Sequence, residues 1–373
     1  MNPEAPIEYF RKHSALADWL KAVQPVERDA ILAEDSTRSS RLELLSSMMG
    51  LPIVGVTAFS GNEVENHAES FDHFVATASG RYAVRAFPPS ESGKVLRNRN
   101  LPVTQLVDWL EHQGVDLDGY SIEFSEHLPN HWASIFAVRP TGVLGEMVRG
   151  SLRQLTQGGP AAASAVSFNY DFHNWSFDDA APEWRRIAEH ALEYTKVTDP
   201  GVRTALSERL DCEFTEDGHL CGYFETIVTP QQEIRFIDYN VALGNQIGDS
   251  YIELTKKNSE STPVRNEIRG RTASRGSATG RSRLLIFDAS EAMDIDDGDI
   301  IVCVEPTPDM VPLLSRAGAL VADRGGVLSH ASIVCRELGI PCVVGTATAT
   351  EMIADRSVIT VDADNATVRL AAA

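Results

Sequence analysis

The stretch from residue 255 to residue 283, TKKNSESTPVRNEIRGRTASRGSATGRSR, divides the sequence into two unlike parts. It is rich in Ser, Thr, Gly and Arg, and it carries eight Lys or Arg against two Glu in a chain of formal net charge −20. A polar segment without apolar periodicity is typical of a linker. We therefore predict one domain over 1–258, a linker over 259–275 and a second domain over 276–373, which suits a length of 373 residues.

The part after this stretch alternates short apolar runs with helix-like runs. Five β-branched runs predict strands, at 283–287, 299–304, 319–323, 341–345 and 357–362. The two runs between them that predict helices, each with a glycine suited to a C-cap, are 310–318 and 329–339. Such an alternation predicts a small α/β fold.

The part before the stretch mixes helices with paired strands, which predicts an α+β fold. Helices are expected at 36–49, 103–113 and 181–196. Strands are expected at 82–87, as a pair within 120–138 and as a hairpin within 222–240.

Composition excludes several classes of protein. The sequence has no run of 18 apolar residues, and its N-terminus lacks the apolar core of a signal peptide. The five cysteines form no CxxC pair, which suits reduced thiols and a cytoplasmic location. The strong negative charge argues against nucleic acid or an anionic membrane as a partner.

The run DRGGVLSHASIVCRELGIP, residues 323–341, contains a single histidine. Gly325 and Gly326 permit tight backbone angles, and Ser329 is a good N-cap for the helix that follows. His330 would then lie at a helix N-terminus, where free amides and the helix dipole favour an anion such as a phosphoryl group. Neutral imidazole is also a competent nucleophile. The alternative is a histidine that only satisfies its own helix.

The longer run TPDMVPLLSRAGALVADRGGVLSHASIVCRELGIPCVVGT favours the first interpretation. It resembles the phosphohistidine swivelling domain of the phosphoenolpyruvate-utilising enzymes, dikinase-type phosphotransferases such as phosphoenolpyruvate synthase and rifampin phosphotransferase. The resemblance implies that His330 carries a phosphoryl group between two sites and that Arg336 belongs to the same loop. Leu328 stands where the dikinases have a threonine that is phosphorylated for regulation, so we do not expect that regulation here.

A phosphohistidine needs a phosphoryl donor, and the hairpin within 222–240 offers a metal site for one. Asp238 and Asn240 point to one face of their strand, and Glu225 can meet them if the two strands pair. Two carboxylates and an amide oxygen suit Mg²⁺. An exposed acidic face is the alternative. This spacing resembles the metal end of the ATP-grasp fold, which implies an ATP-grasp-like N-terminal domain with ATP as substrate.

Other segments resemble the ATP-grasp family more loosely. The strand YAVRAF implies that Arg85 contacts phosphates and that the loop after it closes over them. YSIEFSEHL implies that Glu123 and Glu126 contact adenine or ribose. The opening segment of that family has a phosphate-binding lysine. Here the candidates are Arg38 and Arg41, which the sequence does not separate.

Together these resemblances imply an ATP-dependent, AMP- and phosphate-forming phosphotransferase that phosphorylates a small molecule through His330. Because the chain ends soon after the histidine and has only a linker between its parts, we do not expect pyruvate as acceptor. The alternatives are a phosphocarrier subunit that serves an acceptor site on a separate protein, and an ATP-grasp ligase that makes an acyl phosphate.

Overall fold

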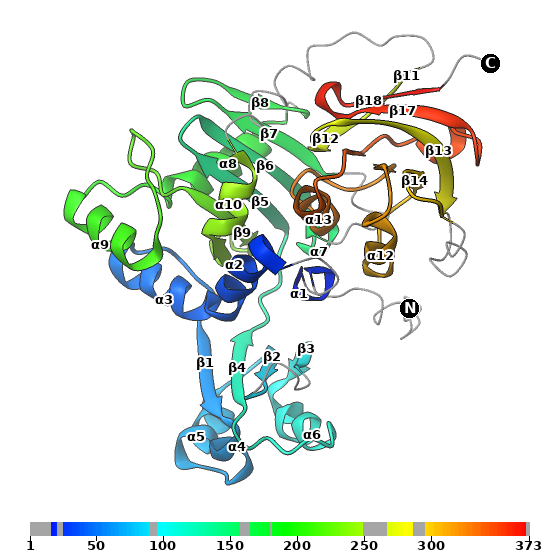
Figure 1. Ribbon diagram of the computed structural model, residues 1–373. Helices are drawn as coiled ribbons and strands as arrows, with labels where there is room; N and C mark the ends of the chain where they lie inside the picture. The colour runs from blue at the N-terminus through cyan, green and yellow to red at the C-terminus, as the bar shows by residue number, and fades with distance from the viewer. Residues whose placement is uncertain are drawn as a thin grey trace.

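The computed structural model describes residues 16–20, 25–89, 95–156, 165–179, 181–248, 267–285 and 295–370. Its strands form three sheets, each with its own helices, and the sheets follow one another along the chain (Figure 1). Within the described ranges, no helix has the length and apolar character needed to cross a bilayer.

The first sheet is antiparallel, with the strand order β1-β4-β2-β3, and it forms the lower lobe in Figure 1. Its strands are β1 (Val56–Ser60), β2 (Arg81–Phe87), β3 (Leu96–Pro102) and β4 (Ser121–Glu126). Its helices are α4 (Gly61–Glu65), α5 (Glu69–Thr77) and α6 (Leu106–Glu111), the last preceded by a 3-10 turn at Val103–Gln105. Phenylalanine rings fill the space between the sheet and α5, among them Phe59, Phe71 and Phe124.

The second sheet is also antiparallel, with the order β10-β9-β5-β6-β7-β8. Its strands are β5 (Trp132–Arg139), β6 (Gly142–Arg149), β7 (Val166–Tyr170), β8 (Trp175–Phe177), β9 (Gly222–Val228) and β10 (Ile234–Asn240). The helices in this part of the chain are α2 (Pro25–Ser36), α3 (Arg38–Met49), α7 (Arg153–Thr156), α8 (Pro182–Glu193), α9 (Pro200–Leu210) and α10 (Val241–Gln246). The strands β5 and β6 are buried on both faces, so a second layer of structure covers each side of this sheet.

The third sheet is mixed and belongs to the C-terminal part, with the order β11-β18-β17-β13-β14-β15-β16-β12. Its strands are β11 (Glu267–Arg269), β12 (Arg271–Ser274), β13 (Ser277–Leu285), β14 (Ile300–Cys303), β15 (Ala319–Ala322), β16 (Cys342–Val344), β17 (Val358–Asp362) and β18 (Thr367–Leu370). The helices are α12 (Val311–Leu314), α13 (His330–Leu338) and α14 (Ala349–Met352), with 3-10 turns at Pro308–Met310 and Ala363–Asn365. The strands β13, β14, β15 and β16 pair in parallel, and α12 and α13 connect β14 to β15 and β15 to β16, which makes this an α/β domain.

The five predicted C-terminal strands and the helix α13, which ends at Gly339 in the left-handed conformation, are confirmed. The predicted hairpin of β9 and β10 is confirmed as well. The pairing predicted within 120–138 is wrong, because β4 pairs with β1 and β2 whereas β5 pairs with β6 and β9. Sequence proximity suggested a hairpin, but the chain passes from one sheet to the next between these two strands.

The predicted linker is also corrected at its C-terminal end. Residues 267–274 form β11 and β12, which pair with β18 and β16 at the two edges of the third sheet. Their polar composition hid this pairing, since Ile268, Thr272 and Ala273 are buried while the charged neighbours remain partly exposed. Residues 259–266 lie outside the described residues, and the two domain boundaries stay a prediction.

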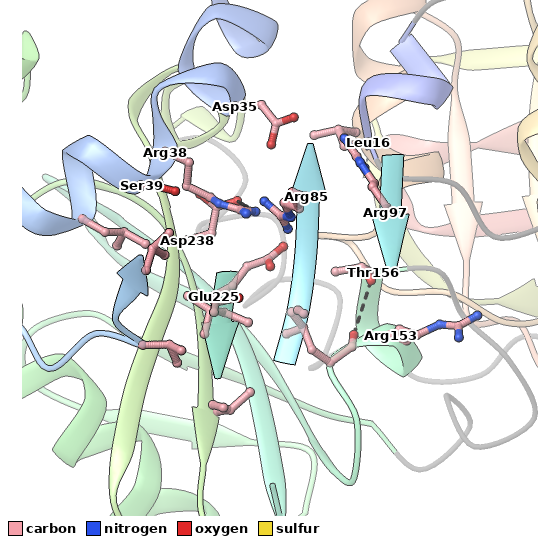
Figure 2. A pocket seen from close by; sticks show the side chains of 18 of the residues that line it. Leu16, Asp35, Arg38, Ser39, Arg85, Arg97, Arg153, Thr156, Glu225 and Asp238 are labelled. Atoms are coloured by element: carbon pink, nitrogen blue, oxygen red, sulfur yellow. Dashed lines mark hydrogen bonds and ion pairs between the residues drawn. The ribbon is translucent and has the colours of Figure 1, made fainter. Parts of the chain in front are cut away.

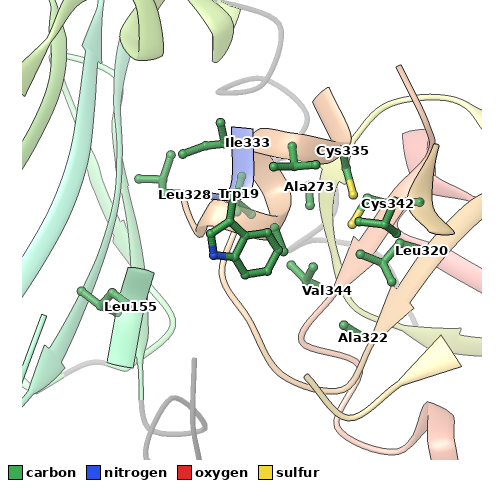
Figure 3. Close-up of a cluster of buried hydrophobic side chains, with 14 of the residues drawn as sticks. Trp19, Leu155, Ala273, Leu320, Ala322, Leu328, Ile333, Cys335, Cys342 and Val344 are labelled. Atoms are coloured by element: carbon green, nitrogen blue, oxygen red, sulfur yellow. The ribbon is translucent and has the colours of Figure 1, made fainter. Parts of the chain in front are cut away.

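The C-terminal domain packs on the second sheet through a continuous apolar cluster. The cluster joins Ile135 and Ile227 of that sheet to Leu320 and Ile333 of the C-terminal domain. The short helix α1 (Leu16–Leu20) adds the buried ring of Trp19, which lies among C-terminal side chains (Figure 3). The end of α13 that bears His330 is thereby held beside the N-terminal domain.

Candidate active site

A cavity of about 440 Å³ lies where the first sheet, the second sheet and the C-terminal domain meet. Its walls come from β2, β3 and β4 on one side, from β9 and β10 on another, and from α2, α3 and α7. Charged side chains line it, with the arginines Arg38, Arg85, Arg97 and Arg153 and the acids Asp35, Glu126, Glu225 and Asp238. His330 lines the same cavity.

The hairpin of β9 and β10 brings the predicted acids together. Glu225 and Asp238 are direct partners across the two strands, next to a bulge between Phe236 and Asp238. Both line the cavity, and the hydroxyl of Tyr223 donates a hydrogen bond of 2.8 Å to Glu225 Oε1. Two carboxylates therefore face one space from adjacent strands.

The environment of Asp238 suits a cation. Its Oδ1 atom is buried, and none of the described groups hydrogen-bonds to that atom. Burial raises the pKa of Asp238 to about 6, against the opposing effect of Arg38, whose Nη1 lies 3.9 Å from Asp238 Oδ2. An unsatisfied, buried carboxylate oxygen beside a second carboxylate is the kind of donor set that Mg²⁺ takes.

Asn240, predicted as a metal ligand, lines the cavity, but its side-chain oxygen caps a helix. Its Oδ1 accepts a hydrogen bond of 2.7 Å from the amide of Leu243, which makes Asn240 the N-cap of α10. Among the described residues, no group of three or more His, Cys, Asp or Glu side chains is arranged to hold a metal. The acid pair of Glu225 and Asp238 is therefore the main part of the predicted metal site.

The structure separates the two arginine candidates on α3. Arg38 lines the cavity, and its side chain and that of Arg85 point toward each other across it (Figure 2). Arg41 is buried away from the cavity, where it pairs with Glu34 and donates to the carbonyl of Tyr239. The interpretation of Arg41 as a phosphate ligand is therefore corrected, because one turn of helix places it under the end of β10.

The hydrogen bonds of Glu34 explain the structural role of Arg41. Its carboxylate accepts hydrogen bonds from the amides of Val241, at 2.7 Å, and Ala242, at 2.9 Å, at the start of α10. Arg41 thus neutralises a carboxylate that fixes the junction between β10 and α10. This junction carries Asp238 and Asn240.

The two acids of β4 lie differently. Glu126, at the end of the strand, lines the cavity, whereas Glu123 is not among the described lining residues. Glu123 instead accepts a hydrogen bond of 3.0 Å from the Ser39 hydroxyl, and it is the strand partner of Arg85. A direct nucleotide contact is thus supported by position for Glu126 and not for Glu123. Residues 90–94, part of the loop predicted to close over phosphates, lie outside the described residues.

The histidine loop has the predicted local structure. Ser329 is the N-cap of α13 and accepts from the amide of Ser332, and Gly325 has a φ of 118° that favours glycine. His330 is the first residue of the helix and only 7% exposed, with its ring edge-to-face to Trp19 at 6.3 Å between centroids. The imidazole therefore sits at a helix N-terminus, at the edge of a charged cavity.

Arg336 holds the loop from within its own domain. Its Nη1 donates to the carbonyl of Val327 at 2.8 Å and to that of Ala273 at 2.9 Å. The Ser332 hydroxyl donates to the carbonyl of Gly326 at 2.6 Å. Arg336 Nε also donates to Gln246 of α10 at 3.2 Å, which is a contact between the two domains.

Several cavity residues escaped the sequence analysis. Arg97, Arg153 and Asp35 carry no motif of their own, and only the packing of β3, α7 and α2 brings them to the cavity. Outside the cavity, Glu146 of β6 also escaped the sequence analysis, although the sequence carries a signal for it. It is the one charged residue among the buried positions of β6, and such a residue almost always has a partner.

The fold and site thus define a histidine-bearing α/β domain docked on a charged cavity, and the comparisons agree for that domain. Residues 295–366 match the family model of the PEP-utilising enzyme, mobile domain. The matched residues lie within the C-terminal domain and include His330.

The matching relatives are longer proteins. A probable phosphoenolpyruvate synthase of Methanothermobacter thermautotrophicus is 47% identical over 106 residues, which are 28% of this chain and 15% of that protein. The phosphoenolpyruvate synthase of Pyrococcus furiosus is 52% identical over 95 residues, 26% of this chain and 12% of that protein. The uncharacterized phosphotransferase YvkC of Bacillus subtilis is 48% identical over 97 residues, with the same shares of 26% and 12%. The chain therefore spans only a small part of the length of these relatives.

Among solved structures, the D-cycloserine synthetase DcsG matches with 13% identity, over 57% of this chain and 64% of that chain, with a TM-score of 0.32. An ATP-grasp ligase of Chryseobacterium gregarium matches with 14% identity, over 61% of this chain and 56% of that chain, with a TM-score of 0.30. Scores this low do not establish a shared fold.

Proposed function

We propose that this chain is an ATP-dependent phosphotransferase that phosphorylates a small molecule through a phosphohistidine at His330. The observation that carries the proposal is the single cavity lined both by His330 and by the acids and arginines of the N-terminal domain. A nucleophile and a donor site must share one space for direct transfer. The N-terminal domain acts in this proposal as an ATP-grasp-like nucleotide domain.

The cavity has the size and charge for a nucleotide. Small-molecule sites commonly measure about 300–1,000 Å³, and this cavity falls in that range. Arg38 and Arg85 reach it from α3 and β2, so guanidinium groups from two walls can neutralise the phosphate oxygens of one triphosphate. Glu126 also lines this cavity, and in this proposal it contacts the ribose or the base.

Glu225 and Asp238 would hold the magnesium ion that accompanies ATP. The buried and unsatisfied Oδ1 of Asp238 fits this role, and Glu225 is its partner across the hairpin. When bound, Mg²⁺ neutralises charge on the phosphate oxygens. Burial raises the pKa of Asp238, and the positive charge of Arg38, 3.9 Å from Asp238 Oδ2, opposes this rise and favours the ionised carboxylate.

The local structure at His330 suits phosphoryl transfer. A buried imidazole is shielded from water, and a nitrogen of His330 can attack the β-phosphorus of ATP. The bond from this phosphorus to the oxygen bridging the α and β positions breaks, and AMP leaves with that oxygen. Water then cleaves the terminal phosphate from the pyrophosphorylated histidine, and the β-phosphoryl group stays on His330 at the helix N-terminus.

The second half of the reaction unloads the histidine. A hydroxyl or nitrogen of the acceptor attacks the phosphorus, the bond to the imidazole breaks and the acceptor loses a proton. We propose a small molecule as this acceptor, and an acceptor site on a separate protein is the alternative. In either case, the C-terminal domain carries the phosphoryl group.

Labelled ATP tests the proposal. With [β-³²P]ATP and Mg²⁺, wild-type protein should become labelled and release AMP, whereas [γ-³²P]ATP should yield labelled phosphate and leave the protein unlabelled at the end of the reaction. The label should be stable in alkali and lost in acid, as expected for phosphohistidine. His330→Ala should bind ATP as the wild type does and take up no label.

Three outcomes would change the assignment. Labelled His330→Ala protein would remove His330 from the reaction. Formation of ADP only when a carboxylic acid is added would identify a ligase that makes an acyl phosphate. Transfer of the labelled phosphoryl group to a second protein, with no transfer to any small molecule in a metabolite screen, would identify a phosphocarrier.

A further inference from the structure

Glu146 is a buried carboxylate in the middle of the interface between the two domains. It lies on β6, where seven consecutive residues are buried, and it is only 1% exposed. A carboxylate in such a place is costly unless other groups neutralise it and hydrogen-bond to it. Its partners therefore show what this residue is for.

Among the described residues, the hydrogen-bond and ion-pair partners of the Glu146 carboxylate all come from the C-terminal domain. The amides of Val327 and Leu328, which precede His330 in the histidine loop, donate to the Glu146 carboxylate at 2.9 Å and 3.3 Å. Arg271 of β12 donates to Glu146 Oε1 at 3.1 Å and also to the Ser167 hydroxyl of β7. A side chain of the second sheet thus binds the histidine loop through backbone amides of the loop.

The surroundings of Gly326 show the contact between Glu146 and the histidine loop in a second way. A Cβ atom built on Gly326 would lie 1.9 Å from Glu146 Oε2, and its three nearest atoms all belong to the Glu146 carboxylate. The φ angle of Gly326 is not in the left-handed region, so its backbone does not require glycine. Gly325 differs, because it has a φ of 118°, and a Cβ atom there would make only ordinary contacts within its own domain, the nearest with Val344 at 3.8 Å. Glycine is therefore required at position 326 because Glu146 of the N-terminal domain lies against it, and not because of the backbone conformation of the loop.

We propose that Glu146 is a docking residue, which holds the histidine loop against the N-terminal domain and so positions His330 on the cavity for loading. The proposal deepens the proposed function and rests on it for the loading step alone. Departure of the C-terminal domain to an acceptor would break both amide hydrogen bonds and the ion pair with Arg271. Glu146 thus contributes to the balance between docked and departed states, beside the apolar cluster and the contact of Arg336 with Gln246.

Hydrogen–deuterium exchange at the amides of Val327 and Leu328 measures docking without any reaction. We expect Glu146→Gln and Gly326→Ala to speed exchange there by roughly tenfold to a hundredfold, the range for hydrogen bonds to a charged acceptor. Glu183→Gln is the matched control, because it removes an acid paired with Arg149 at the exposed end of the same strand. It should leave exchange at both amides unchanged.

The rate at which [β-³²P]ATP labels His330 measures loading. Both docking variants should load more slowly by a similar factor, while their affinity for ATP, measured by equilibrium dialysis, should stay within about threefold, since Glu146 is not a lining residue of the cavity. The two changes should not be additive. In Glu146→Ala, the further change Gly326→Ala has no carboxylate left to clash with and should add little.

Unchanged exchange at both amides in folded Glu146→Gln and Gly326→Ala would overturn the proposal, and so would additive effects in the double variant. If Glu146→Ala does not fold, as judged by circular dichroism, Gly326→Ala still carries the test from the loop side. Failure of the proposed function would look different. Wild-type protein would then take up no label at all, while the exchange experiment would still report whether Glu146 holds the loop.

Discussion

The cavity of the N-terminal domain and the histidine loop of the C-terminal domain hold their polar groups in different ways. The loop is a continuous stretch, and bonds within that stretch from Ser329, Ser332 and Arg336 fix its shape. The cavity instead collects side chains that lie up to 200 residues or more apart in the sequence, and Arg38 of α3 and Asp238 of β10 are separated by 200. The shape of the loop therefore depends largely on its own residues, whereas the cavity depends on two sheets and several helices at once.

The largest expected effect on this difference between cavity and loop comes from the acid pair Glu225 and Asp238. We expect Asp238→Asn to lower the rate of His330 labelling about a hundredfold or more, because a metal ligand and a fixed charge on the phosphates are lost together. Single-turnover labelling with [β-³²P]ATP measures this. Glu233→Gln, just before the same strand and paired with Arg235 outside the cavity, is the control and should load normally. Equal rates for Asp238→Asn and the control would remove the acid pair from the site.

Substitution of the two arginines of α3 should affect different properties, stability for Arg41 and ATP binding for Arg38. Arg41→Ala leaves Glu34, which is 22% exposed, without its cation, so it should lower the free energy of unfolding by roughly 2 to 4 kcal/mol. Arg38→Ala should change stability little and weaken ATP binding about tenfold, since it removes one phosphate contact. Chemical denaturation and equilibrium dialysis separate the two effects. An Arg38→Ala protein that is strongly destabilised but binds ATP normally would contradict the assignment.

A comparison of two serine N-caps tests whether the cap at Ser329 affects loading of His330 as well as stability. Ser329 caps α13 and Ser60 caps α4 in the first sheet's lobe, each by accepting from a backbone amide. Changing either to Ala should cost about 1 kcal/mol of stability. Only Ser329→Ala should also slow loading of His330, because only this cap orients the reacting helix end. Similar loading by both variants would show that the cap serves stability alone.

The smallest expected effect concerns pH and lies away from the cavity. Burial lowers the pKa of His219 below its usual 6.5, so the folded state binds this proton less well than the unfolded chain does. The contribution of neutral His219 is fully present above pH 6.5 and is lost as the pH falls toward its lowered pKa, by at most about 1.4 kcal/mol per pH unit. His219→Gln should flatten this part of the pH–stability curve. Denaturation from pH 7.5 to pH 5 measures the slope, and an unchanged slope would contradict the prediction.

The cysteines agree with the sequence analysis in one respect and extend it in another. All five are buried free thiols, as expected for a chain without a CxxC pair. Burial raises the pKa of the Cys303 and Cys342 thiols, both in the C-terminal sheet. These thiols therefore act as small apolar side chains of the core, which the sequence does not reveal.

The sequence by itself determined the features that depend on near neighbours. The strands and helix around His330, the cap at Ser329 and the hairpin that pairs Glu225 with Asp238 all follow from residues close together in the chain, because caps, turns and hairpins are local interactions. The resemblance of the histidine loop was strong for the same reason. Its residues are contiguous.

Tertiary structure alone decided which distant groups meet. Arg38 and Arg41 have the same charge and lie one turn apart, and only the packing of α3 against β10 sends one into the cavity and the other under a strand end. Glu146 and Gly326 lie 180 residues apart in the sequence, and only docking of two domains makes a glycine necessary there. Contacts of this kind depend on the burial of whole faces against one another, which no local pattern records.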